Sequence, residues 1–434
     1  MKKVAFYTLG CRVNTYETEA IAETFIKHGY EIVEFDEFAD VYVVNTCTVT
    51  NIGDKKSRQM LRRAKRINPE GIVAAVGCYV QVAPDEVEKL EDVDIIIGTK
   101  DKGKIIELVE EFEGNRKKIK HVENVMSIRH FEELEIDEYQ DKTRAFLKIQ
   151  DGCDRFCSYC LIPFARGPVR SRKPEKILKE VEKLASNGYK EIILSGIHVA
   201  SYGKDLKDID LVDVIEMIQK VEGIERIRTG SVDPTFFTED KIKRLKNIEK
   251  FCPHFHLSLQ SGCDETLKRM NRHYTTYEYK MVVENLREAF EDVSITTDII
   301  VGFPGETDDE FQRTYEFLSQ IKLAKMHVFK YSPRRGTKAA EMKEQVKESI
   351  KEERSHKLIE LDKRLEEEFV NKFIGKTMDV LFEEFNEGYY WGYTKNYIRV
   401  GVENNKDLSG QIINVKILES RENKAIGKVE TEVK

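Results

Sequence analysis

The sequence predicts an α/β protein that ends in a small β-barrel. Three observations support this fold class: apolar strand-like runs alternate with amphipathic helical segments in two series, a polar stretch separates the series, and the end of the chain changes to short alternating runs. We therefore expect an open parallel-sheet domain at residues 1–114 and a connector at 115–142. A partial (βα)6 barrel at 143–370 and a small antiparallel β-barrel at 371–434 should follow.

The first series contains predicted strands at residues 3–8, 41–45, 72–76 and 94–97. Helical segments lie between them, which is typical of a parallel sheet with helices on its faces. Cys11, Cys47 and Cys78 each follow one of these strands. Open α/β sheets bind ligands beyond the carboxyl ends of their strands, so we expect the three sulfur atoms to lie close together. A buried, inert thiol explains any one of these cysteines, but explains three at equivalent positions poorly.

The start of the chain, MKKVAFYTLGC, has the basic residues and apolar run of a short signal sequence. A secretory signal needs about 7 to 15 apolar residues. The run from Val4 to Leu9 is shorter and includes Tyr7 and Thr8, and a helical pattern follows it directly. We therefore expect folded protein here. Eight cysteines in 434 residues are too few for a disulfide scaffold, and no segment is apolar enough to span a membrane, so a cytoplasmic protein is expected.

The second series contains six predicted strands, at residues 145–149, 191–194, 226–229, 255–259, 295–301 and 327–331. A complete barrel of this type needs eight. After the first of these strands, QDGCDRFCSYC places Cys153, Cys157 and Cys160 in a CxxxCxxC array. Clustered thiolates bind zinc or iron–sulfur centres. A structural zinc site needs four ligands and no histidine stands at a suitable distance, so a four-iron cluster with one open iron is favoured.

The CxxxCxxC array, with Tyr159 before its third cysteine, resembles the radical S-adenosylmethionine superfamily. The resemblance implies that the open iron binds S-adenosylmethionine, which is then split to release a 5′-deoxyadenosyl radical. Residues just past later strands would contact this cofactor: Ser195, Gly196, Ser258, Gln260 and Gly302. Ordinary strand-to-helix turns are the alternative interpretation of these positions.

A three-cysteine α/β domain before such a barrel, with a small β-barrel after it, resembles the methylthiotransferases over nearly the whole chain. The resemblance implies a second four-iron cluster, on Cys11, Cys47 and Cys78, and an RNA-binding TRAM-like barrel at the end. TLGCRVNTYE, VVNTCTVTNIGDKKSRQMLRRA and CDRFCSYCLIPFARG look most like the branch that methylthiolates carbon 2 of N6-threonylcarbamoyladenosine beside the tRNA anticodon. Asp233 stands where that branch more often has glutamate.

Other functions stay open at this point. The related branches act on isopentenyladenosine in tRNA or on an aspartate of a ribosomal protein, and a non-catalytic RNA-binding protein with structural metal is the alternative from a different class. The methylthiotransferase resemblance further implies a reductase such as flavodoxin or ferredoxin, and a source of sulfur. One S-adenosylmethionine would donate the methyl group and a second would provide the radical, because an unactivated aromatic C–H has no acidic proton for a general base.

A dense basic patch, KKSRQMLRRAKR at residues 55–66, carries seven basic residues and no acidic one in a chain of net charge −7. Such a local reversal of charge is suited to meet nucleic-acid phosphates, although a solvated helix face is the alternative. The predicted RNA contacts are Lys55, Lys56, Arg58, Arg62 and Arg63. Trp391 is a candidate for stacking on a base, with packing in the barrel core as its alternative.

Overall fold

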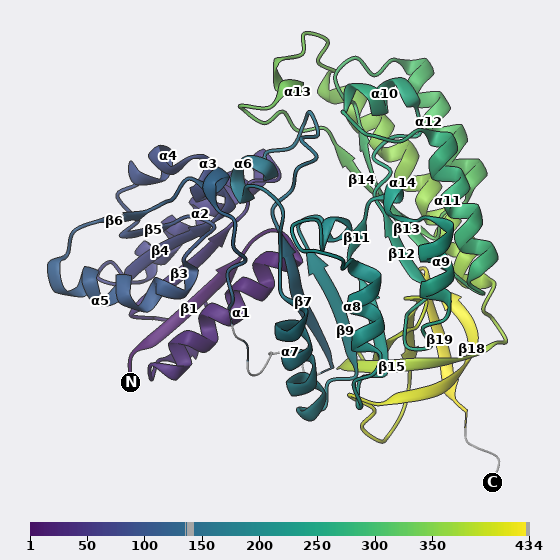
Figure 1. Cartoon of the computed structure of the whole chain (residues 1–434), viewed down its shortest axis with the longest axis horizontal. Helices are drawn as coiled ribbons and strands as arrows, with labels where there is room; N and C mark the ends of the chain where they lie inside the picture. Colours follow the sequence, from purple (N-terminus) through teal and green to yellow (C-terminus); the bar gives the residue numbers. More distant parts are fainter. Residues whose placement is uncertain (135, 137–142, 431–434) are drawn as a thin grey trace.

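The chain folds into three parts that follow one another along the sequence (Figure 1). The computed structural model describes residues 1–134, 136 and 143–430. The end of the predicted connector, at 135 and 137–142, lies outside the described residues. Within the described part of the chain, no helix combines the length and the apolar character that crossing a membrane requires.

The N-terminal domain is a six-stranded, all-parallel sheet in the order β2-β1-β3-β4-β5-β6. Its strands are β1 (Lys3–Thr8), β2 (Glu31–Val33), β3 (Val41–Thr46), β4 (Ile72–Gly77), β5 (Ile95–Ile97) and β6 (Ile119–His121). The helices are α1 (Arg12–Lys27), α2 (Asn51–Ile67), α3 (Cys78–Val82), α4 (Pro84–Glu88) and α5 (Ile105–Asn115). The predicted open parallel sheet is confirmed. β2 and β6 are additional edge strands, three residues each, and β6 falls within the predicted connector.

Helices cover both faces of this sheet because alternate strand residues point to opposite sides. Ile72, Ala74 and Val76 of β4 pack in one core cluster with α1 and α5. Val73 and Ala75 pack in another with α2, α3 and α4. This double burial explains why the strands are continuously apolar in sequence.

The central part contains two four-stranded sheets, β10-β9-β7-β8 and β11-β12-β13-β14, and a parallel bridge joins Ile227 to Phe251, in the segment just before β12. Its strands are β7 (Arg144–Asp151), β8 (Arg170–Ser171), β9 (Glu191–Gly196), β10 (Arg226–Thr229), β11 (Ser231–Val232), β12 (His254–Leu257), β13 (Ser294–Val301) and β14 (Lys325–Lys330). The six predicted strands correspond to β7, β9, β10, β12, β13 and β14, so the predicted partial barrel is confirmed.

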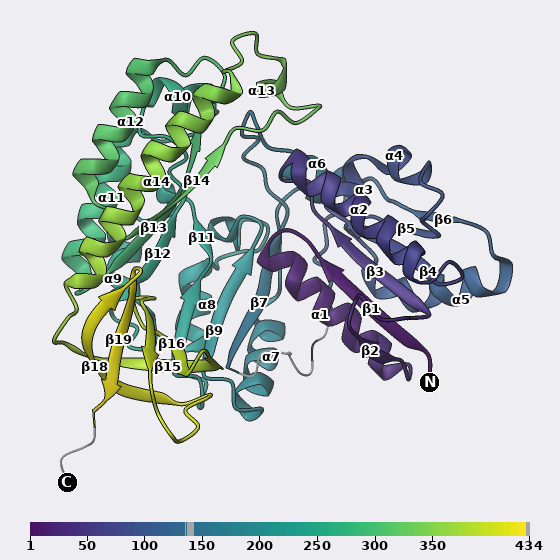
Figure 2. The same ribbon diagram turned by 180° about the vertical axis from the view of Figure 1, so that it is seen from behind.

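The helices of the central part follow these strands, and α14 continues toward the C-terminal barrel (Figures 1 and 2). They are α6 (Ile162–Arg166), α7 (Pro174–Ser186), α8 (Leu211–Ile218), α9 (Glu239–Lys246), α10 (Asp264–Arg269), α11 (Thr276–Ala289), α12 (Asp308–Ile321), α13 (Lys338–Glu341) and α14 (Glu348–Asn371). α1 of the N-terminal domain lies beside β7, and Tyr16 and Ala20 of α1 share the core cluster of the barrel.

Five strands at the end of the chain close into a barrel in the order β15-β16-β17-β19-β18. They are β15 (Thr377–Asn386), β16 (Tyr389–Thr394), β17 (Arg399–Val402), β18 (Ile412–Arg421) and β19 (Lys424–Val429). The predicted small barrel is confirmed, but β17 and β19 are parallel while the other neighbours are antiparallel. Strand directions cannot alternate all the way round a closed ring of five, so one neighbouring pair must be parallel.

This C-terminal barrel packs against the starts of the central strands. Arg226, the first residue of β10, donates to the carbonyls of Tyr393 (2.8 Å) and Asp379 (2.9 Å). Arg144, the first residue of β7, forms an ion pair with Glu383. The predicted cofactor residues lie at the opposite ends of the strands, which leaves that edge of the partial barrel clear of the C-terminal barrel.

Candidate iron–sulfur and nucleic-acid sites

The first cysteine triad gathers at one edge of the N-terminal sheet. Cys11 precedes α1 after β1, Cys47 follows β3, and Cys78 begins α3 after β4. Because β1, β3 and β4 are neighbours in the sheet, their carboxyl ends lie side by side. Gly10 has a φ of +103°, and a Cβ on it would lie 2.9 Å from Cys47 Sγ. The structure therefore brings the Cys11 and Cys47 loops into direct contact.

Two thiols of this triad are buried and Cys11 is exposed. Burial raises the pKa of Cys47 to about 11, with further upward contributions from Cys78 and Cys11. Burial also raises the pKa of Cys78, against the opposing charge of Arg166. That guanidinium donates from Nε to Cys78 Sγ at 3.2 Å. A buried cation beside a thiol favours the thiolate, which is the form that binds metal.

The second triad lies in the loop between β7 and α6. Its path is held by hydrogen bonds from Cys153 N to the Gly167 carbonyl (3.0 Å) and from Ser158 Oγ to the Arg269 carbonyl (2.8 Å). Tyr159 packs edge-on against Phe303, with ring centroids 6.3 Å apart. The aromatic residue that led to the superfamily resemblance thus anchors the loop in the barrel.

An arginine also donates a hydrogen bond to a sulfur atom of the second triad. Arg272 Nη1 donates to Cys157 Sγ at 3.3 Å. Burial raises the pKa of Cys153 to about 11 and that of Cys160 to about 12, and the neighbouring Cys157 adds to both shifts. Burial thus opposes ionisation of the free thiols, and a bound metal would favour the thiolate that ligates it.

The sulfur atoms of the two triads are not drawn together as closely as around a single metal ion. Thiolates around one zinc ion, with Zn–S bonds of about 2.3 Å, lie roughly 3.8 Å apart. Among the described residues, which include all six cysteines, neither triad brings its three sulfur atoms within 4.8 Å of one another. Three thiolates are the ligand set for a four-iron cluster with one iron left open. Ligation by these cysteines remains a prediction.

Ser195 and Gly196 end β9, beside the part of β7 that leads to Cys153. Ser195 is buried. A Cβ on Gly196 would lie 2.8 Å from Oε1 and 3.0 Å from Cβ of Gln150, so Gly196 packs closely on β7. Both residues stand at the edge that carries the cysteine loop, and their contact with S-adenosylmethionine remains a prediction.

The other three predicted cofactor residues each have a structural reason for their identity or conformation. Ser258 Oγ lies 2.7 Å from Ser231 Oγ. Gln260 has a φ of +73° and donates from its backbone N to the Asp298 carbonyl (2.9 Å). Gly302 has a φ of +68°, and a Cβ there would lie 2.3 Å from Cγ of Lys351. Packing thus accounts for Gly302, and a cofactor role of these residues stays a prediction.

Asp233, which departs from the expected glutamate, is buried near the second triad. It forms ion pairs with Arg272 (3.3 Å) and Arg155 (3.5 Å). Burial opposes ionisation of Asp233, but the neighbouring His198, 3.7 Å away, and the charge of Arg272 hold its pKa well below the usual value. Asp233 therefore belongs to the network that orients Arg272 toward Cys157.

The predicted RNA contacts lie on α2, and several of them have partners within the protein. Arg63 forms an ion pair with Asp36 (2.5 Å) and Arg62 lies 3.9 Å from Asp92. Arg58 donates to Tyr79 Oη (2.9 Å). Lys55 is exposed and Lys56 is half-buried. Arg58 also lines a cleft of about 950 Å³ between the N-terminal domain, α6 and the loop after β14. RNA contact by these residues remains a prediction.

Sequence reasoning did not single out Arg166, Arg272 or Arg334, which the structure places beside the cysteine triads. Arg334 follows β14, is buried, and donates to Thr48 Oγ1 (2.8 Å) next to Cys47. No local signal separates a buried arginine from an exposed one. The position of Arg166 shortly after CxxxCxxC, in CLIPFARG, was the clue available for that residue.

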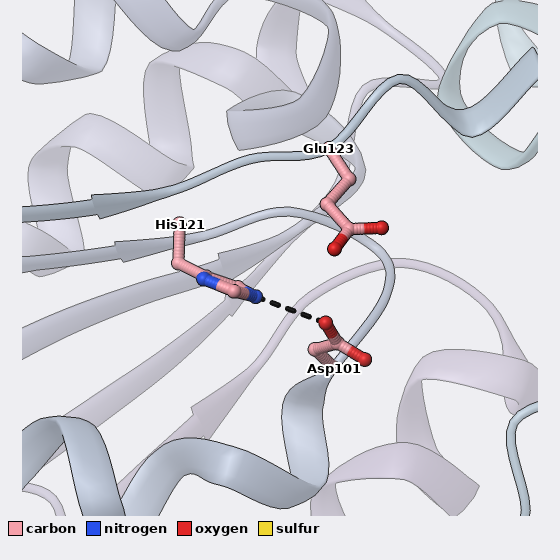
Figure 3. Close-up of side chains that lie close together, drawn as sticks. All are labelled: Asp101, His121 and Glu123. Atoms are coloured by element: carbon pink, nitrogen blue, oxygen red, sulfur yellow. Dashed lines mark hydrogen bonds and ion pairs between the residues drawn. The ribbon is translucent and has the colours of Figure 1, made fainter. Parts of the chain in front are cut away.

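Two other groups of side chains of the types that bind metals form ion pairs with lysine or arginine. In Figure 3, His121 points from the end of β6 to Asp101, with Nε2 and Oδ2 3.0 Å apart. Glu123 completes this group, but Lys100 pairs with it at 2.8 Å and Lys104 pairs with Asp101 at 3.1 Å.

The second group has the same character. It joins Cys263, Glu265 and Glu310, and Arg313 and Arg269 pair with its two carboxylates.

Known proteins resemble this chain along most of its length. Residues 147–318 match the Radical SAM superfamily, and residues 3–98 match the family described as uncharacterized protein family UPF0004. The chain is 44% identical to the threonylcarbamoyladenosine tRNA methylthiotransferase MtaB of Bacillus subtilis (strain 168), over 97% of this chain and 94% of that protein. Identity to the MtaB of Aquifex aeolicus (strain VF5) is 43%, over 96% and 100%.

A relative with a different substrate name is more distant. Identity to the tRNA-2-methylthio-N(6)-dimethylallyladenosine synthase of Caldicellulosiruptor saccharolyticus is 36%, over 97% of this chain and 91% of that protein. Among solved structures, the radical S-adenosylmethionine methyltransferase TsrM from Kitasatospora setae has a TM-score of 0.57 at 14% identity, over 77% of each chain. That likeness concerns the fold alone. The end-to-end identity to named relatives decides the family, and the chain belongs to the methylthiotransferase family of radical S-adenosylmethionine enzymes.

Proposed function

We propose that this protein methylthiolates carbon 2 of N6-threonylcarbamoyladenosine next to the anticodon of tRNA. The observation that carries this proposal is the 44% identity to MtaB of B. subtilis over 97% of the chain. The dimethylallyladenosine synthases are the alternative, and those compared are 34 to 38% identical to this chain.

The two cysteine triads would hold two four-iron clusters, and S-adenosylmethionine is the second cofactor. Bound there, these groups supply the methylthio sulfur carrier, the methyl group and the carbon-centred radical that takes hydrogen from the adenine. The chain's own residues provide three thiolates for each cluster and one donating arginine beside each triad. Such hydrogen bonds to cluster sulfurs are one of the ways in which a protein sets cluster potential.

The partners follow from this chemistry. Reductive cleavage needs an electron donor such as flavodoxin or ferredoxin, and the inserted sulfur needs a source, as expected for a cytoplasmic enzyme. For tRNA, the C-terminal barrel offers Trp391, with the Arg399 guanidinium 4.9 Å and the Lys424 ammonium 5.4 Å from its ring centroid. Aromatic rings beside cations suit unpaired bases with their phosphates. Residues 371–434 are thus the proposed RNA-binding barrel, and α2 offers the second basic surface.

The substrate is tested by nucleoside analysis of tRNA from cells with and without the gene. Loss of the 2-methylthio form of threonylcarbamoyladenosine in the deletion strain, restored by the wild-type chain, is the expected result. Normal levels in a strain without any other enzyme of this activity would contradict the substrate. Loss of methylthiolated isopentenyladenosine instead would support the alternative branch.

The division of labour between the triads is tested with purified enzyme under anaerobic conditions. Cys11→Ala should still cleave S-adenosylmethionine to 5′-deoxyadenosine but should not form methylthiolated product. Cys153→Ala should lose both activities. Cys252→Ala is the control, because Cys252 is a buried thiol outside both triads and should retain both. Loss of both activities in Cys11→Ala would mean that Cys11 supports folding instead.

A further inference from the structure

Arg166 connects the two cysteine-bearing regions of the molecule. It ends α6, the short helix that follows Cys160, and its side chain is fully buried. From there it reaches into the N-terminal domain, where Nε donates to Cys78 Sγ at 3.2 Å. α3 and α6 lie side by side in both views (Figures 1 and 2), which is what makes this reach short.

The other arm of the guanidinium contacts α1. Nη2 donates to Asn14 Oδ1 at 2.7 Å and to Glu17 Oε2 at 3.0 Å, and Nη1 pairs with Glu17 Oε1. Asn14 and Glu17 lie in the first turns of the helix that Cys11 precedes. Arg166 of the central part thus contacts Cys78, which follows β4. It also contacts α1, the helix that follows β1 and Cys11.

Asn14 extends this contact to the remaining loops. Its Nδ2 donates to the carbonyl of Leu9 (2.7 Å), just before Gly10 and Cys11, and to the carbonyl of Thr46 (3.1 Å), just before Cys47. Arg166 and Asn14 together therefore contact the polypeptide at all three cysteines of the first triad.

Among the described residues around Arg166, cations outnumber the carboxylates that pair with them. Two carboxylates, Glu17 and Asp151, stand within ion-pair distance of four cations. These cations are Lys102, Lys148, Arg166 and Arg170. A third carboxyl, Glu132, acts on Lys102 and Lys148, but burial raises its pKa. Buried cations are stabilised by nearby negative charge, so the cations of this described network would favour an anionic group such as a thiolate-ligated cluster.

We propose that Arg166 is a positioning residue for the cluster at Cys11, Cys47 and Cys78: it holds the three cysteine loops in place through Cys78 and Asn14, and raises the reduction potential of that cluster. This inference rests on the proposed function, because it requires that cluster. Reduction adds negative charge, which a guanidinium donating to a ligand sulfur stabilises. Arginine suits the task because its planar fork donates in several directions at once.

The test uses the full-length chain with Cys153, Cys157 and Cys160 changed to Ala, so that a single cluster remains. After anaerobic reconstitution, iron is measured and the cluster is titrated potentiometrically with detection by electron paramagnetic resonance. Arg166→Gln should shift the midpoint to a more negative potential or reduce bound iron several-fold. The matched control is Lys148→Gln, because Lys148 is equally buried and pairs with Glu17 but donates to no cysteine.

A shift or iron loss in Arg166→Gln that Lys148→Gln does not share would support the proposal. Equal effects of both variants would overturn it, since the network would then act through folding alone, and so would an unchanged potential and iron content in Arg166→Gln. If Arg166→Gln does not fold, Arg166→Lys carries the test by the same criteria, because it keeps the buried charge but cannot span all three partners. Failure of the parent chain to bind about four irons would count against the two-cluster function instead.

Discussion

At the scale of single residues, the two cysteine triads share one design. Each has an arginine that donates to one sulfur: the buried Arg166 donates to Cys78, and the half-buried Arg272 donates to Cys157. Each arginine is itself oriented by a carboxylate, Glu17 for the first and Asp233 for the second. Burial raises the pKa of thiols in both triads. A fixed cation beside them stabilises the negative charge of the thiolates that bind metal.

Gly10 decides how closely two of the cysteine loops can approach. Gly10→Ala should reduce bound iron from about eight to about four per chain, because its Cβ would meet Cys47 Sγ at 2.9 Å. Iron and sulfide analysis after reconstitution measures this. The matched control is Gly29→Ala, which has a positive φ of +78° but no heavy atom within 4 Å of the added Cβ. Full iron content in Gly10→Ala would contradict the prediction, because it would show that the Cys11 and Cys47 loops can shift to accommodate the added Cβ.

At the scale of secondary structure elements, α2 combines two roles. Its buried side, with Met60, Leu61 and Ala64, packs on the sheet, and its outer side carries the basic patch. The ion pairs of Arg62 and Arg63 with acidic neighbours are exposed, and exposed pairs are weak enough for phosphates to replace the carboxylates.

The patch on α2 makes a prediction about tRNA affinity. Arg62→Glu combined with Arg63→Glu should weaken binding and make the logarithmic salt dependence shallower by about 0.9 for each phosphate that the variant no longer neutralises. Filter binding or fluorescence anisotropy across a salt series measures both quantities. Lys343→Glu with Lys347→Glu, a charge reversal of equal size in another part of the chain, is the control. An unchanged salt dependence of tRNA binding in the α2 variant would support the alternative interpretation, that the patch is only a solvated helix face.

At the scale of the whole molecule, the N-terminal domain contacts the partial barrel at two places, after its first strand and after its last strand. Arg166 reaches it from the helix after the first barrel strand, and Arg334 reaches it from the loop after the last. Arg334 donates to Thr48 and Asn51 and pairs with Asp54, all in the segment after Cys47. The two triads are thereby held in a fixed relation to each other, which the proposed function requires because both clusters must act on the same adenine.

The contacts of Arg334 should stabilise the N-terminal domain against unfolding. Arg334→Ala should lower the free energy of unfolding of the N-terminal domain by about 2 kcal/mol, because the half-buried Asp54 loses its ion pair and Thr48 loses its hydrogen bond to the guanidinium. Calorimetry would then show an earlier or separate transition. Arg335→Ala is the control, since that neighbouring side chain is exposed and should not move the transition. Identical melting of both variants would mean that the interface does not depend on this arginine.

Much of the fold was predictable because local patterns encode it. The strands at residues 3–8 and 191–194 appear where the apolar runs predicted them, as β1 and β9. β2 and β6 were missed because three residues with charged or polar neighbours carry no periodic signal. The parallel pair β17 and β19 was missed because strand pairing across a barrel depends on closure, which no segment records by itself.

The sequence by itself determined the two cysteine triads, since CxxxCxxC is a local spacing and equivalent strand ends follow from the repeat of strand and helix. Only the tertiary structure decided what surrounds them. Arg166 and Cys78 are 88 residues apart and belong to different parts of the chain, so no spacing joins them. The same holds for Arg334 and Thr48, 286 residues apart. Which arginine meets which cysteine loop depends on how two independently patterned units dock, and that is a property of their packed surfaces.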